Sequence, residues 1–193
     1  SNESTAARGN VVSSIGMLFA VLVTVVEIVN PVLVLSAVLL GALIGSAFAL
    51  KVKMTSIPEM VALFNGFGGL SSFFLAWSEF NNLSAISLIM ILSFLTVLIG
   101  GITFSGSVVA FFKLSEILKG NNNFLNRASR WFLIFSFLFI IIAVIQVLAG
   151  GLGYEFIDLA LIQKIFIALL IISLLAGLAF VLPIGGGDMP VVI

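Results

Sequence analysis

The 193-residue sequence contains no cysteine and no histidine, and only 8% of its residues are charged. The absence of cysteine excludes disulfides and thiol chemistry within the chain. Without cysteine and histidine, the usual zinc sites and a Ser-His-Asp triad are also excluded. Eight basic and eight acidic side chains cancel, so no strongly basic surface is available to bind nucleic acid. We therefore expect no metal site and no nucleic-acid partner.

Apolar residues dominate what is present. They make up 62% of the chain, and the mean hydropathy is +1.36. Because a helix crosses the hydrocarbon core of a bilayer in about 20 residues, six apolar stretches of that order predict six transmembrane helices. The sequence thus predicts an all-α fold, a polytopic helix bundle that forms a single transmembrane domain over residues 1–193. The six predicted spans are residues 11–29, 32–50, 57–78, 83–112, 131–149 and 159–182.

The two ends of the sequence suggest a piece of a longer protein. The chain begins without methionine, and after the sixth span the residues PIGGGDMPVVI indicate the start of a seventh helix. The first apolar stretch follows Arg8, as in a secretory signal peptide, but no small-residue cleavage site comes after it. We therefore interpret this stretch as the first span, with a signal peptide as the minor alternative.

The basic residues indicate how the spans are oriented. If the helices alternate in direction, seven basic residues lie on one side of the membrane and only Lys164 lies nearer the other. Cytoplasmic loops carry an excess of Lys and Arg, so we expect both ends of the sequence in the cytoplasm; scattered loop charges are the alternative explanation. The seven residues are Arg8, Lys51, Lys53, Lys113, Lys119, Arg127 and Arg130.

The fourth stretch has one small and polar face. Its members recur at alternating steps of three and four residues, which places them on one side of a helix. The commoner explanation is that the hydroxyls bond to carbonyls of their own helix or join two helices. The alternative is a hydrated path through the bundle. The residues are Ser93, Thr96, Gly100, Thr103, Ser107 and Ala110.

The third stretch carries an amide well below the membrane surface. Ser56 can cap this helix, with Pro58 in the first turn and Glu59 three residues after the cap, which is the pattern of a capping box. Asn65 lies about 10 Å deeper than Pro58, at about 1.5 Å per residue. Because an unpaired amide in hydrocarbon is costly, we expect Asn65 to bond to a neighbouring helix or to water.

The glycines occur in patterns with different meanings. Gly41 and Gly45 form a G-x-x-x-G pair in the second stretch, which typically packs against another helix. The third stretch contains Gly66-Phe67-Gly68-Gly69, which lacks the third glycine of G-x-G-x-x-G and opens no βαβ unit. We therefore expect no nucleotide cofactor to bind to this chain.

Three stretches, in this order along the chain, resemble one family. They are MTSIPEMVALFNGFGGL at 54–70, TFSGSVVAFFKL at 103–114 and LPIGGGDMPVVI at 182–193. The chain is similar to the membrane domain (domain II) of the β subunit of the proton-translocating NAD(P) transhydrogenases. The resemblance covers essentially the whole chain, although the stretches between the motifs agree only in hydropathy.

The resemblance implies an enzyme that moves hydride between NAD(H) and NADP(H) in soluble domains and couples this transfer to proton translocation. The chain would be its proton-conducting part in the bacterial inner (plasma) membrane. The implied partners are the lipid bilayer, the membrane helices of the α subunit and the NADP(H)-binding domain of the same β chain, within a homodimer of αβ units. From the residues alone, the core of a secondary transporter for a small solute or a purely structural membrane subunit also fits.

The resemblance also implies roles for individual residues. Asn65 corresponds to a proton-path position that carries histidine in some members and asparagine in others. Since asparagine cannot ionise, the titrating group would come from another chain. Asp188 corresponds to an acidic residue in the loop that faces the NADP(H) domain, and Glu59 to a position near the cytoplasmic mouth. Thr103 and Ser107 join them as candidates from the polar face of the fourth stretch.

Overall fold

A computed structural model describes residues 3–27, 31–81, 88–118, 123–151 and 159–185 of the chain. These residues form α-helices, one short 3-10 helix and no strand. Six helices in the described ranges are long and apolar enough to cross a membrane, which confirms the predicted all-α helix bundle. They are α1 (Glu3–Glu27), α2 (Pro31–Lys51), α3 (Ile57–Asn81), which follows the 3-10 helix η1 (Met54–Ser56), α4 (Leu88–Leu114), α5 (Asn123–Gly151) and α6 (Leu159–Val181).

Two helices begin earlier than the hydropathy pattern predicted. α1 begins at Glu3 and α5 at Asn123, each eight residues before the predicted start of its span. The additional turns are polar, with the sequences ESTAARGN and NFLNRASR. Hydropathy marks where side chains leave water, whereas backbone hydrogen bonding can continue beyond that point. The predicted start of the fourth span at 83 and the start of the seventh helix lie outside the described residues.

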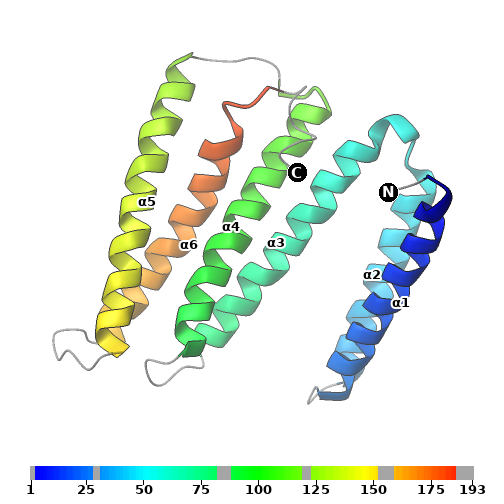
Figure 1. Cartoon of the computed structure of the whole chain (residues 1–193), viewed down its shortest axis with the longest axis horizontal. Coiled ribbons are helices and arrows are strands. Elements are labelled where there is room, and N and C mark those ends of the chain that lie inside the picture. Colours follow the sequence, from blue (N-terminus) through cyan, green and yellow to red (C-terminus); the bar gives the residue numbers. More distant parts are fainter. Residues whose placement is uncertain (1–2, 28–30, 82–87, 119–122, 152–158, 186–193) are drawn as a thin grey trace. The chain divides into compact units, whose positions relative to one another are not determined.

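The chain divides into two compact units, Ser1–Val52 and Lys53–Ile193. In the first unit α1 and α2 contact each other and run in opposite directions (Figure 1). A Cβ built at Gly41 or Gly45 meets no other atom within 4 Å. Within the first unit, the predicted packing face of α2 therefore makes no close contact with α1. The single transmembrane domain over 1–193 stays a prediction.

α4 is the central helix of the second unit. It packs against α3 on one side and α6 on the other, and α5 packs mainly on α6. Figure 1 shows this row in the order α5, α6, α4, α3. The burial agrees with the order, because 44% of the α4 span and 50% of the α6 span are buried, against 17% of the α5 span. Residues on α4 can therefore contact two neighbouring helices.

Large aromatic side chains fill the end of this unit where α3 finishes and α4 and α6 begin. The rings of Phe80 and Phe166 stack with centroids 3.8 Å apart, and Phe94 packs at an angle against both. Met90 and Ile162 are fully buried in the same cluster. Such packing is a main source of helix association in a bilayer, where lipid removes the usual hydrophobic driving force.

α3 and α4 touch through glycines at mid-length. A Cβ at Gly69 would lie 2.8 Å from the carbonyl oxygen of Gly100, and a Cβ at Gly100 would lie 2.7 Å from the carbonyl oxygen of Gly69. Any side chain here would separate the helices, so the two backbones meet directly. Asn65 lies about one turn before Gly69 on α3, and the close approach therefore brings its side chain to α4.

Candidate functional site

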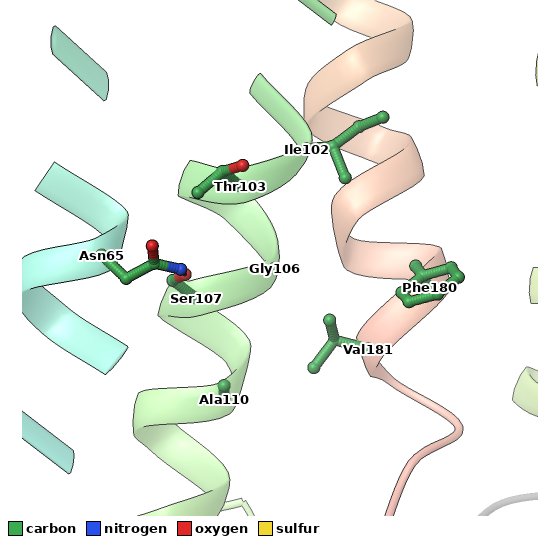
Figure 2. A pocket seen from close by; sticks show the side chains of 8 residues that line it. All are labelled: Asn65, Ile102, Thr103, Gly106, Ser107, Ala110, Phe180 and Val181. Carbon is green, nitrogen blue, oxygen red and sulfur yellow. The ribbon is translucent and has the colours of Figure 1, made fainter. Parts of the chain in front are cut away.

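Asn65 of α3 is hydrogen-bonded to Ser107 of α4. Its amide Nδ2 donates to the Ser107 Oγ over 2.9 Å, and Figure 2 shows the two side chains meeting between the helices. The expectation that this deep amide bonds to a neighbouring helix is thereby confirmed. As a whole Asn65 is exposed on the surface of the described structure, and its Oδ1 accepts no hydrogen bond from the described residues.

Ser107 differs from two other hydroxyls of the predicted polar face, those of Ser93 and Thr96. Ser93 and Thr96 each donate to the carbonyl oxygen four residues earlier in α4, over 2.9 and 2.7 Å. The Ser107 hydroxyl accepts a hydrogen bond from Asn65. The described part of the chain supplies no acceptor for the hydroxyl proton of Ser107. The buried Ser107 hydroxyl can therefore accept one hydrogen bond and donate another.

A pocket of about 150 Å³ lies beside this pair, between α3, α4 and α6 (Figure 2). Its polar groups are the Asn65 amide and the hydroxyls of Ser107 and Thr103. Water needs room and polar partners within reach to be held by a protein; this pocket has room for water, and three polar side chains line it. The lining residues are Asn65, Ile102, Thr103, Gly106, Ser107, Ala110, Phe180 and Val181.

The polar pocket occupies only one half of the α3–α4 interface. Beyond Thr103, the contact between Gly69 and Gly100 closes the interface, and the aromatic cluster around Phe94 follows. In that half the hydroxyls bond within α4, as the commoner explanation of the polar face proposed. In the half that contains Ser107, a hydroxyl joins two helices beside a pocket with room for water.

Glu59 and Asp188 are not placed beside this pocket by the described structure. Glu59 lies in the first turn of α3 and is half-buried. Asp188 lies outside the described residues. The predicted capping box is not formed in the part of the chain that the structure describes. Ser56 is the last residue of η1, which precedes α3, and its backbone N–H donates to the Lys53 carbonyl oxygen over 2.9 Å instead of to the Glu59 side chain.

Lys113 makes contacts that the sequence analysis did not predict. Its Nζ donates to the carbonyl oxygens of Val181, at 3.2 Å, and Ile184, at 2.6 Å, and also to that of Leu182. α6 ends at Val181, where a helix leaves its last carbonyls without partners and favours a nearby cation. In the sequence, Lys113 counted only as one of the basic residues that orient the chain.

No group of three acidic side chains that could hold a metal ion occurs among the described residues. The side-chain hydrogen bonds between helices described above involve neutral polar groups and one lysine. The pocket joins Asn65, Thr103 and Ser107, and Lys113 bonds to the same end of α6 that supplies Val181 to the pocket.

The chain matches one protein family along its whole length. The family described as NAD(P) transhydrogenase beta subunit matches residues 1–193. Two curated relatives, both named NAD(P) transhydrogenase subunit beta, come from Rhodospirillum rubrum and from one strain of that species; each is 28% identical over 204 residues. The alignments cover 100% of this chain and 42% of each relative, so the chain spans about two-fifths of their length. Since the family match includes every described helix and the polar pocket, this chain belongs to the NAD(P) transhydrogenase beta subunit family.

Proposed function

We propose that the chain is the proton-conducting membrane part of a transhydrogenase that couples proton translocation to hydride transfer between NAD(H) and NADP(H). The observation that carries the proposal is the hydrogen-bonded pair of Asn65 and Ser107 beside a pocket with room for water, in a helix bundle of this family. Family membership also supports this function over the core of a secondary transporter, the alternative that the residues alone left open.

In this proposal Asn65 orients a proton carrier and does not itself titrate. An amide has no ionisable proton near neutral pH. One of the two N–H groups of its Nδ2 donates to Ser107, and Oδ1 is left to accept a hydrogen bond from water or from a protonated group. The Ser107 hydroxyl can pass a hydrogen bond on to water in the pocket, and Thr103 provides the next hydroxyl along α4.

The titrating group is proposed to come from another chain. Two observations support this: the sequence has no histidine, and Asn65 is exposed on the surface of the described helices. In a bilayer an uncovered amide oxygen is costly, so a polar group of a neighbouring helix would stabilise it. We assign that helix to the α subunit, within a homodimer of αβ units in the bacterial inner membrane.

The remaining candidates take the roles that the family resemblance implies. Glu59, six residues before Asn65, would lie at the cytoplasmic entrance of the route. Asp188 would face the NADP(H)-binding domain of the same β chain. Both ends of this chain would then be cytoplasmic, and both nucleotides would bind outside it.

The proposal is tested by Asn65→Leu in the complete enzyme, reconstituted into vesicles. Proton uptake linked to hydride transfer should fall at least about tenfold, equivalent to about 1.4 kcal/mol in the barrier. Hydride exchange that needs no net proton passage should be retained better, because the soluble domains are unchanged. Asn65→His should keep part of the uptake, since a titrating group could act at this position.

Asn81→Leu is the matched control, because Asn81 is an exposed asparagine at the other end of α3. It should leave proton uptake unchanged. If Asn65 only holds two helices together, Asn65→Leu should lower the melting temperature by the loss of one bond, about 0.6 to 2 kcal/mol. A destabilised Asn65→Leu enzyme with normal proton uptake would contradict the proposal.

A further inference from the structure

Val181 connects the polar pocket to Lys113. Its side chain lines the pocket, where it lies against Gly106 of α4: a Cβ built at Gly106 would be 3.1 Å from Val181 Cγ2. Its carbonyl oxygen accepts a hydrogen bond from Lys113 Nζ over 3.2 Å. A displacement of the end of α6 would therefore change both the wall of the pocket and the contact with Lys113.

The ammonium of Lys113 has three N–H donors, and three carbonyl oxygens accept from it. The acceptors are the last residue of α6 and two residues of the segment that leaves it, Leu182 and Ile184. Hydrogen bonds from a charged donor are roughly twice as strong as neutral ones. Lys113 therefore holds the exit of α6, residues 182–185, against the end of α4.

The end of α4 that carries Lys113 has a defined backbone geometry. Glu116 has a φ of 56°, in the left-handed region where glycine is the usual residue. Its N–H donates to the carbonyl oxygen of Lys113 over 3.1 Å, and the N–H of Ile117 donates to that of Phe112 over 3.0 Å. Such a conformation persists only where the surroundings hold it, so the helix end provides a firm support for the lysine.

We propose that Lys113 is a positioning residue for coupling, which makes the exit of α6 move together with the wall of the Asn65–Ser107 pocket. This inference rests on the proton-translocating function proposed above. Ile184, the last of the three acceptors, lies four residues before Asp188 in the sequence. A movement of residues 182–185 would thus reach the wall of the pocket through Val181.

Apolar packing alone could also seat the exit of α6 on α4. Leu182 and Ile184 pack beside a cluster that includes Val109 and Ala110 of α4. Lys113→Met keeps an unbranched apolar side chain and leaves this cluster in place, so it removes only the three bonds from the ammonium. Lys113→Arg keeps the charge, but its planar guanidinium cannot direct three donors from one atom.

The first measurement is the proton uptake per hydride transferred by the complete enzyme in vesicles. Lys113→Met should lose at least half of this ratio, and Lys113→Arg should lie between Lys113→Met and the unchanged enzyme. Lys53→Met is the matched control, because Lys53 is exposed, lies on the same predicted side of the membrane and donates no side-chain hydrogen bond in the described structure. The control should keep the ratio.

The second measurement is independent of proton passage. The chain has no cysteine, and Gly185 is exposed, so Gly185→Cys in an otherwise cysteine-free enzyme reports on the exit of α6. Its reaction with a water-soluble maleimide should be several-fold faster in Lys113→Met than with Lys113 present. If Lys113→Met does not assemble, the same comparison is made with Lys113→Arg, for which a smaller acceleration is expected.

An unchanged labelling rate, or a changed rate with a normal proton-to-hydride ratio, would leave Lys113 as a helix cap only and overturn the inference.

The two proposals fail in different ways. Normal pumping by Asn65→Leu with impaired pumping by Lys113→Met would reject the route through Asn65 and keep the role of Lys113. Impaired pumping by Asn65→Leu, with Lys113→Met unchanged in both measurements, would reject the role of Lys113 alone.

Discussion

The bond between Asn65 and Ser107 places two neutral polar groups against each other at a depth where water is scarce. A serine in a membrane helix can bond to its own backbone, as Ser93 does over 2.9 Å. Ser107 instead accepts from another helix over a similar distance. Among the described residues, Ser107 therefore depends on Asn65, and Asn65 on Ser107, for a side-chain partner.

This mutual dependence predicts that substitutions of the two residues are not additive. Ser107→Ala leaves the Asn65 Nδ2 without a partner, and Asn65→Leu removes the donor. Their coupling energy in thermal unfolding of the complete enzyme should be about 0.6 to 1.7 kcal/mol, the range of interhelical hydrogen bonds in membranes. Ser93→Ala, the control, should show no coupling to Asn65→Leu. Additive effects of Asn65→Leu and Ser107→Ala would contradict the bond.

At the scale of elements, the crossing of α3 and α4 decides whether the pair can form. Backbone atoms of Gly69 and Gly100 are in direct contact, and this contact fixes the separation of the helices about one turn away from Asn65. Ser107 is also close to α3, since a Cβ built at Gly66 would lie 3.2 Å from the Ser107 Cβ. A wider crossing would therefore break the hydrogen bond before it disturbed the helices themselves.

Gly69→Ala tests this crossing, because the added Cβ would lie 2.8 Å from the Gly100 carbonyl oxygen. It should destabilise the enzyme by about 1 to 3 kcal/mol, as overpacking of a close contact does, and should reduce proton uptake. Gly68→Ala is the control, because a Cβ at Gly68 meets nothing within 4 Å. It should be neutral or stabilising by up to about 1 kcal/mol. Equal melting temperatures for the two variants would argue against the glycine crossing.

At the scale of the whole molecule, the orientation in the membrane determines which ends of the helices would face the proposed nucleotide-binding domains. α3 has 25 residues, and at about 1.5 Å per residue it is long enough to cross a hydrocarbon core of about 30 Å. Lys53 precedes it, and Glu79 lies in its last turn. These two positions should therefore be on opposite sides of the membrane.

Single cysteines at these positions test the orientation. Lys53→Cys should react with membrane-impermeant thiol reagents only from the cytoplasmic side, and Glu79→Cys only from the other side. The labelling is measured in intact cells and in inverted vesicles, with the cysteine-free enzyme as the blank. Reversed labelling would contradict the cytoplasmic placement of Lys113 and of the segment that leads to Asp188.

The sequence by itself determined the class of fold and singled out Asn65, the residue at the centre of the candidate site. Hydropathy shows where helices cross a membrane, because lipid leaves a backbone no partner except its own helix. The same scarcity of water marks Asn65, since a deep amide needs a partner wherever the helices lie. Hydropathy did not predict where α1 and α5 begin, because the first turns of these two helices lie outside the apolar stretches.

Only the tertiary structure decided which partners meet. Several hydroxyls share the polar face of α4, and nothing local shows that Ser107 bonds to Asn65 while Ser93 and Thr96 bond to their own helix. Small residues permit close contact without specifying it. Within the first unit, the G-x-x-x-G pair of α2 makes no close contact with α1, whereas single glycines of α3 and α4 touch in the second unit. Lys113 finds its acceptors about 70 residues further along the chain, at 181–184. Such contacts depend on how helices distant in sequence pack together, and periodicity within one helix carries no information about that.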